Sequence, residues 1–207
     1  MKRIGVFGGA FDPPHNAHLA LAQVAIQALE LDALHIIPTG NAWHKARTLS
    51  SAAHRLAMAH LAFGKLAGVV VDDREIQRAG PTYTIDTLLA LQQEMPGAQL
   101  YLILGADQFA AFNQWHQWQV ILQNAIICIA ARARITGAKC LFDAYNGLQA
   151  RLIELPLPPM SVSATHIRHL VASAQVGGLG ENQALADLLP ETVARYIDQH
   201  QLYQPAA

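Results

Sequence analysis

The chain has 207 residues, of which 52% are hydrophobic and only 14% are charged. This composition excludes an intrinsically disordered protein and is typical of a globular domain with a sizeable hydrophobic core. The formal net charge is −1 at pH 7 with histidine neutral. The chain therefore lacks the basic excess that favours a nucleic-acid polymer as a partner.

The sequence also lacks the patterns of a membrane protein or of a cysteine metal site. No apolar run reaches the roughly 20 residues that a helix needs to span a bilayer, and the apolar run before Gly8 is too short for a signal peptide. Cys128 and Cys140 do not have the spacing of metal ligands. We therefore expect a cytoplasmic protein with reduced thiols and no membrane partner.

Short apolar runs alternate with helical patterns along the chain. We expect strands at residues 4–7, 34–38, 69–71, 100–104, 125–130 and 152–155. Helical patterns follow His15, run from Ser50 or Ser51 to Phe63, begin again at Thr82 or Thr84, and reappear after Ser163 and from Pro190 to Gln199. This alternation predicts an α/β fold, namely a Rossmann-like doubly wound parallel sheet with helices on both faces and a small C-terminal helical part. We expect one domain over 1–207, with the sheet core in about 1–160 and the C-terminal part in about 161–207.

The most informative stretch, residues 4–18, reads I-G-V-F-G-G-A-F-D-P-P-H-N-A-H. A strand is expected to break at Gly8-Gly9, and His15 and His18 follow at an i, i+3 spacing where a helix begins. A glycine turn before a helix N-terminus forms an anion site, and two histidines there indicate a polyphosphate ligand. Two alternatives stay open, because such turns are common in α/β proteins and the histidines could be surface residues or metal ligands.

A second candidate anion site lies near the other end of the chain, where residues 161–168 read S-V-S-A-T-H-I-R. Ser163 can cap a helix whose first turns carry Thr165 and Arg168. Hydroxyls and a guanidinium at a helix N-terminus can hold phosphate oxygens. The alternative is an ordinary capped helix with a solvated arginine.

Both motifs resemble those of the nucleotidylyltransferase superfamily. The first is similar to its G-x-F-D-P-x-H-x-G-H signature, with Ala17 in place of glycine and Ala10 in place of threonine or serine. The second is similar to its I-S-S-T-x-I-R motif, with Val162 and Ala164 as departures. A helical backbone accepts alanine at position 17, whereas Ala10 lacks a hydroxyl that could contact phosphate. Because the two motifs bracket the expected sheet, the resemblance covers essentially the whole chain.

Three further stretches resemble the bacterial nicotinate mononucleotide adenylyltransferases. G-P-T-Y-T-I-D-T-L at 80–88 is similar to their S-Y-T-x-x-T-L segment, and residues 105–118 are similar to G-x-D-x-x-x-x-F-x-x-W. W-H-K at 43–45 is similar to P-P-H-K, with Trp43 in place of proline. The resemblance implies that the acceptor is a pyridine mononucleotide.

The resemblance also implies a set of site residues. ATP would be bound by Gly8, Gly9, Ala10, Phe11, His15, His18, Gly105, Asp107, Arg132, Ser163, Thr165 and Arg168. The acceptor nucleotide would be bound by His44, Lys45, Tyr83, Thr84 and Trp115. The residues expected to act in catalysis are His15, His18, Lys45 and Arg168.

The chemistry of these side chains fits the implied roles. Trp115 offers a flat surface for a pyridine ring, Lys45 offers a point charge for a phosphate, and Asp107 suits a ribose hydroxyl. Simpler readings remain for each: Trp115 could pack against Trp118, Asp107 could cap a helix, and Arg132 could form a salt bridge. Arg134 is less well placed for a phosphate than Arg132.

The implied reaction is adenylyl transfer from ATP to nicotinate mononucleotide, giving nicotinate adenine dinucleotide and pyrophosphate. Mg2+ would accompany ATP, held mainly by phosphate oxygens and water, because the sequence shows no cage of protein ligands. Nicotinamide mononucleotide and phosphopantetheine are competing candidates for the acceptor. Two different classes of protein also stay open: a non-catalytic nucleotide-binding regulator, which Ala10, Ala17 and Ala164 would favour, and a zinc protein using His15 and His18. Homo-oligomerisation and the preference between acid and amide pyridines are likewise undecided by the sequence.

Overall fold

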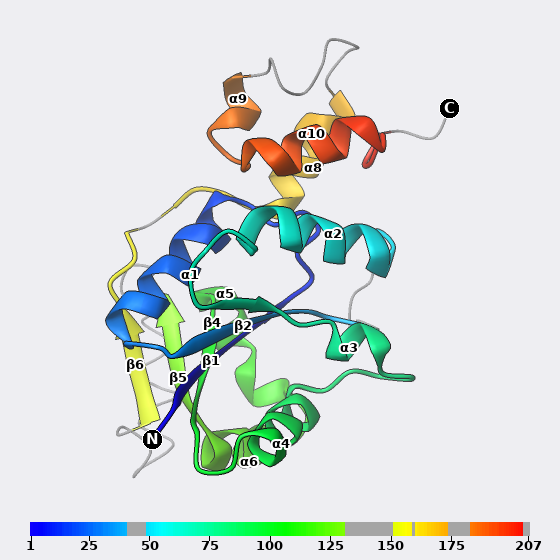
Figure 1. Ribbon diagram of the computed structural model, residues 1–207. Coiled ribbons are helices and arrows are strands. Elements are labelled where there is room, and N and C mark those ends of the chain that lie inside the picture. Colours follow the sequence, from blue (N-terminus) through cyan, green and yellow to red (C-terminus); the bar gives the residue numbers. More distant parts are fainter. Residues whose placement is uncertain (41–48, 131–150, 159, 174–182, 205–207) are drawn as a thin grey trace.

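The computed structural model describes residues 1–40, 49–130, 151–158, 160–173 and 183–204 (Figure 1). Its centre is a six-stranded parallel sheet. The strands are β1 (Arg3–Gly9), β2 (Ala33–Pro38), β3 (Val69–Val71), β4 (Gln99–Leu104), β5 (Ala125–Ala130) and β6 (Leu152–Leu155). Their order across the sheet is β3-β2-β1-β4-β5-β6. The order reverses between β1 and β4, and in open parallel sheets ligands bind at the carboxyl ends of strands beside such a reversal.

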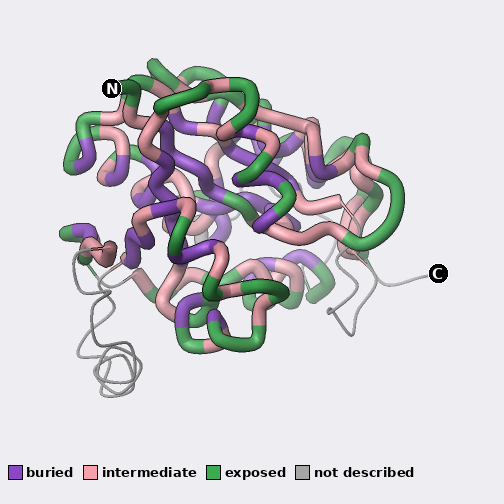
Figure 2. Tube along the Cα trace, turned by 90° about the horizontal axis from the view of Figure 1, so that it is seen from below, coloured by how far each residue is buried: buried purple, intermediate pink, exposed green. Residues whose placement is uncertain are grey.

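The strands are apolar because both faces of the sheet are covered. Alternate residues of one strand belong to two different cores: Ile4 and Val6 of β1 pack in one hydrophobic cluster, and Phe7 packs in the other. Figure 2 shows these buried stretches running through the middle of the molecule. All six expected strands are confirmed, and those at 69–71, 125–130 and 152–155 have the expected bounds.

Helices lie on both faces of the sheet, as the doubly wound prediction requires (Figure 1). One face carries α1 (Asn16–Ala28) and α2 (Ala52–Phe63), and the other carries α4 (Thr84–Glu94) and α6 (Trp118–Asn124). The shorter elements are α3 (Arg74–Gln77), α5 (Ala106–Ala110) and the 3-10 helix η1 (Phe112–Gln114). None of these three short elements was expected from the sequence, because so few residues show no periodicity.

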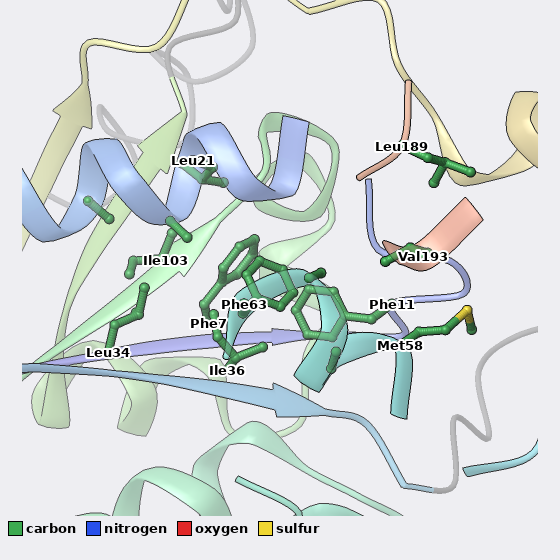
Figure 3. Close-up of a cluster of buried hydrophobic side chains, with 14 of the residues drawn as sticks. Phe7, Phe11, Leu21, Leu34, Ile36, Met58, Phe63, Ile103, Leu189 and Val193 are labelled. Atoms are coloured by element: carbon green, nitrogen blue, oxygen red, sulfur yellow. The ribbon is translucent and has the colours of Figure 1, made fainter. Parts of the chain in front are cut away.

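The C-terminal helices α8 (Ala164–Ser173), α9 (Gln183–Ala186) and α10 (Glu191–Gln199) pack on the face that carries α1 and α2. Leu189 and Val193 join the same buried cluster as Phe7, Phe11 and Phe63 (Figure 3). Burying each such aliphatic side chain contributes about 1.5–3 kcal/mol. This shared core brings the end of the chain over the first motif.

Polar contacts fasten the same junction. The Asn16 N–H donates to the carbonyl of Leu188 at 2.9 Å, and the Thr192 hydroxyl donates to the carbonyl of Leu61 at 3.1 Å. The first bond uses an N–H at the beginning of α1, where helical partners are missing. Within the described ranges, the structure contains no helix with the length and apolarity that crossing a bilayer requires.

Candidate active site

The loop between β1 and α1 is shaped by an aromatic ring beneath it. Phe11 is buried and has a positive φ of 47°, and its ring meets those of Phe7 and Phe63 edge-on. A Cβ at Gly9 would lie 3.2 Å from the Phe11 ring, whereas the nearest atom to a Cβ at Gly8 is a carbonyl oxygen 4.0 Å away. Gly9 therefore makes room for Phe11, and Gly8 leaves open space at the strand end.

The expected break at Gly8-Gly9 is wrong in its position. Strand β1 continues through Gly9 because Gly8 and Gly9 stay in register with Ile37 and Pro38 of β2. A left-handed backbone occurs two residues later, at Phe11. Burial of the Phe11 ring in the core compensates for this strained backbone.

His15 and His18 stand at the first turn of α1, as their spacing predicts. Their rings stack with centroids 3.7 Å apart and planes 22° apart. The backbone N–H of His15 donates to Nδ1 of His18 at 3.2 Å. A backbone N–H can only donate, so Nδ1 of His18 carries no proton and Nε2 carries it in the neutral ring. The loop backbone thus selects the tautomer of His18.

His15 is the more buried of the two, with 7% of its surface exposed. Desolvation by burial lowers the pKa of His15 from 6.5 to about 4, so its ring is neutral at pH 7. Its side chain also takes part in a capping box with the backbone of His18, which helps to hold the ring at the beginning of α1.

Asp12 connects this loop to three other parts of the chain. Its carboxylate accepts from the Tyr203 hydroxyl at 2.7 Å and from the Ser50 N–H at 3.2 Å. Its backbone carbonyl accepts from Nη1 of Arg168 at 2.8 Å. Burial, and next the charge of Asp12, raises the pKa of Tyr203, which keeps the phenol protonated as a donor. Sequence reasoning gave Asp12 no role, although an acid between Phe11 and Pro13 is the signal that could have found it.

The second motif adopts the helix start that its sequence predicts. The Ser163 hydroxyl accepts from the N–H of His166 at 3.2 Å, and α8 begins at the next residue, Ala164. Arg168 holds the Thr165 hydroxyl at 3.0 Å with Nη2 while its Nη1 reaches Asp12. The structure therefore brings Arg168 of the second motif against Asp12 of the first.

Two of the three segments expected to bind the acceptor nucleotide, 80–88 and 105–118, lie on the other face of the sheet. Tyr83 precedes Thr84, the first residue of α4, and its ring lies 4.3 Å from that of His116. Trp115 follows η1 and is half-buried, with its ring 5.6 Å from Phe112. Tyr83 and Trp115 both pack against the second hydrophobic cluster. The structure thus brings two of the three acceptor motifs of the sequence together.

Gly105 and Asp107 lie where β4 ends. Gly105 precedes α5, and Asp107 is exposed in the first turn of that helix. A Cβ at Gly105 would come within 2.8 Å of the Asp107 carboxylate. The acid therefore folds back over the glycine and is not the residue that caps α5.

Comparison with known proteins agrees with this geometry. Residues 6–170 match the model of the cytidylyltransferase-like family. A protein of Albidiferax ferrireducens named "Probable nicotinate-nucleotide adenylyltransferase" is 54% identical over 206 residues, which cover 100% of both chains. The chain belongs to the nicotinate-nucleotide adenylyltransferase family. Another member, from Methylibium petroleiphilum, is 42% identical over 207 residues and covers 99% of this chain and 93% of its own.

A solved structure from Plasmodium falciparum has the same fold as this chain. The nicotinic acid mononucleotide adenylyltransferase of Plasmodium falciparum, complexed with APC, superposes with a TM-score of 0.71 over 98% of each chain. Its sequence identity is 18%, so this likeness supports the fold class alone. The doubly wound α/β prediction is confirmed.

Several residues implied by the resemblance to the adenylyltransferases fall outside the described part of the chain. These are His44, Lys45 and Arg132, together with Trp43, Arg134 and Cys140. Their expected roles stay predictions.

One residue that sequence reasoning missed in this adenylyltransferase is Arg55. Its side chain is 2% exposed on the inner face of α2. It donates to the carbonyls of Ala10, Thr39, Gly40 and Ser50. The signal that could have found it is its place in the apolar stripe of α2, one turn before Met58 and Ala59.

Proposed function

We propose that this chain transfers the adenylyl group of ATP to nicotinate mononucleotide, with the phosphates of ATP bound between the two motifs. The observation that carries the proposal is the bond from Arg168 to Asp12, which places the second motif against the loop that ends at the stacked histidines. The acceptor is inferred from the family, whose Albidiferax member is 54% identical over its whole length.

The reaction is an in-line displacement at the α-phosphorus. A phosphate oxygen of nicotinate mononucleotide forms the new P–O bond while the bond from the α-phosphorus to the bridging oxygen breaks, and pyrophosphate leaves with that electron pair. The attacking phosphate is already an anion at pH 7, so no general base is needed. Catalysis then consists of positioning and of stabilising the charge that develops on the phosphates.

The two histidines suit this task because the tautomer of His18 is set before substrate arrives and His15 is neutral at pH 7. In the neutral ring, His18 has its donor on Nε2, since Nδ1 is occupied by the His15 N–H. The stacked neutral ring of His15 holds the plane of His18 without adding a second charge. We assign His18 to a hydrogen bond with the oxygens of the α-phosphate. We place His15 beside the same phosphate, where its ring supports that of His18. Preorganised donors of this kind are worth about 10²–10³ in kcat.

The other roles follow the layout of the site. We assign Ser163, Thr165 and Arg168 to the β- and γ-phosphates, and Gly8, Gly9, Gly105 and Asp107 to the path of the adenosine along the ends of β1 and β4. Tyr83, Thr84 and Trp115 would receive the pyridine ring and its carboxylate. We keep Lys45 and Arg132 as the cations expected near the transferred phosphates.

Magnesium fits this site as a companion of ATP. Among the residues that the structure describes, no three His, Cys, Asp or Glu side chains form a metal-binding group. The carboxylate of Asp12 is engaged by Tyr203 and Ser50. The ion would therefore be held by phosphate oxygens and water, where it neutralises charge on the leaving pyrophosphate.

The proposal is tested by measuring pyrophosphate release and product mass with ATP and three acceptors in parallel. We expect nicotinate adenine dinucleotide as the product, with kcat/KM for nicotinate mononucleotide at least about tenfold above that for nicotinamide mononucleotide or phosphopantetheine. A higher kcat/KM for another acceptor would identify that acceptor as the substrate. No turnover with any acceptor, together with tight ATP binding, would favour a non-catalytic regulator.

A further inference from the structure

We propose that Arg55 is a positioning residue that holds the ATP loop, residues 8–18, in register with Thr39, Gly40 and Ser50. These three residues flank the acceptor segment, residues 41–48, which lies outside the described residues and to which the sequence assigns His44 and Lys45. Arg55 belongs to α2 and its side chain is buried. The inference rests on the proposed function and assigns a role that no motif in the sequence suggests.

The guanidinium of Arg55 joins three separate stretches of backbone. Nη1 donates to Thr39 at 2.7 Å and to Ala10 at 3.2 Å, Nη2 donates to Gly40 at 3.3 Å, and Nε donates to Ser50 at 3.0 Å. All four acceptors are main-chain carbonyls. A planar guanidinium with five N–H donors can serve several carbonyls at once, which a lysine ammonium cannot do with the same geometry.

The positions of these carbonyls distinguish this arrangement from an ordinary buried arginine. Ala10 lies in the ATP loop, between the strand end and the stacked histidines. In the sequence, Thr39 and Gly40 immediately precede the acceptor segment, and Ser50 lies just beyond its other end. A single side chain therefore fixes the spacing between the segment that receives ATP and both flanks of the segment that carries Lys45.

Other contacts also hold these three backbone stretches in place. The Thr39 N–H donates to the Gly9 carbonyl at 2.8 Å, and the Ser50 N–H donates to the Asp12 carboxylate at 3.2 Å. A Cβ at Gly40 would come within 2.0 Å of the Glu75 carbonyl oxygen. Gly40 is thus held between Arg55 on one side and the backbone of Glu75 on the other.

This placement has a kinetic consequence. In-line transfer requires the acceptor phosphate and the α-phosphorus to meet at near-contact distance, and a misplacement of about 1 Å can cost about 10²-fold in rate. Loss of the Arg55 bonds would leave each substrate its own contacts but relax the spacing between them. We therefore expect kcat to fall while each substrate binds almost as before.

The test compares Arg55→Lys with a matched control, Arg151→Lys. Arg151 also donates to two backbone carbonyls, those of Leu122 and Gln123 at 2.9 and 2.7 Å, but it does so beside α6 and outside the site. Lysine preserves the positive charge in both variants. Measurements are kcat, KM for ATP and for nicotinate mononucleotide, and the thermal midpoint of each protein, with kinetics run well below the lower midpoint.

We expect Arg55→Lys to lower kcat by at least about tenfold with less than about threefold change in either KM, whereas Arg151→Lys keeps wild-type kinetics. Unchanged kcat in folded Arg55→Lys overturns the proposal, as does an equal loss in both variants. Turnover of nicotinate mononucleotide by the wild-type protein in the same assay tests the proposed function independently of the role of Arg55.

Hydrogen exchange provides a readout that does not depend on turnover. Peptides covering residues 8–18 and 36–51 should exchange faster in Arg55→Lys than in the wild type, and those covering residues 118–124 should not change. The reverse pattern should appear in Arg151→Lys. Equal protection of residues 8–18 and 36–51 in Arg55→Lys and wild type would overturn the positioning role even if the wild type turned over no acceptor.

Discussion

The side of the site that we assign to ATP (the ATP side) and the side that we assign to the pyridine ring (the pyridine side) are built in different ways. On the ATP side, buried groups from distant segments converge on one loop: Asp12 is 1% exposed and bonds to Ser50, Arg168 and Tyr203. On the pyridine side, Tyr83 and Trp115 are half-buried and rest on a single hydrophobic cluster. Charge stabilisation needs fixed donors in a dry setting, whereas ring binding needs mainly apolar area. The difference implies that mutations on the ATP side change kcat and stability, and those on the pyridine side change KM.

The largest expected effect comes from His18→Ala, which removes the donor assigned to the α-phosphate. We expect kcat to fall by about 10²–10³-fold with little change in KM, because the contact strengthens in the transition state. His169→Ala changes an exposed histidine of α8 and should leave kcat unaltered. Wild-type turnover in His18→Ala would remove His18 from the catalytic residues.

The second effect is a pH dependence of stability that His15 imposes on the ATP side. Its pKa is about 4 in the folded protein and 6.5 as the ordinary value, so the unfolded chain binds the extra proton as pH falls through this window. The stabilisation is present above pH 6.5 and is lost toward pH 4, by roughly 2 kcal/mol between pH 7.5 and pH 5. Urea unfolding of the wild type and of His15→Gln at both pH values isolates this contribution, which the glutamine variant should lack. Parallel losses in both proteins would show that His15 is not the cause.

A smaller effect is expected for Tyr203→Phe, which deletes the hydroxyl that donates to the buried Asp12 carboxylate. A hydrogen bond to a charged buried group contributes about 1.5–3 kcal/mol, so the free energy of unfolding should drop by this amount and kcat should fall as the loop loosens. The matched change is Tyr196→Phe, whose hydroxyl meets His54 at 3.0 Å outside the ATP loop. If both variants lose the same activity, the hydrogen bond from Tyr203 to Asp12 does not specifically support kcat.

The smallest expected effect concerns Trp115 on the pyridine side. Trp115→Ala should raise KM for nicotinate mononucleotide by about tenfold through lost ring contact and leave KM for ATP unchanged. Trp118→Ala removes a neighbouring ring that also packs near Phe112 and serves as the control. Equal kinetic changes in the two variants would return Trp115 to a packing role.

The sequence determined the parts of this protein that depend on near neighbours in the chain. Apolar runs predicted all six strands, because the central strands are buried on both faces of the sheet and the edge strand β3 consists of three valines. Ser163 predicted its own helix start because its partner lies three residues away. The spacing of His15 and His18 predicted their shared turn for the same reason. The break at Gly8-Gly9 was misplaced because pairing with β2, a tertiary contact, keeps those glycines in the strand.

Only the tertiary structure decided how the loop between β1 and α1 is held. The partners of Asp12 in Arg168 and Tyr203 lie 156 and 191 residues away, and the carbonyls that Arg55 joins lie on three separate segments. The tautomer of His18 depends on a backbone N–H whose direction is set by that loop. No local pattern encodes such contacts, because a hydrogen bond between remote segments depends on where the packed core places them.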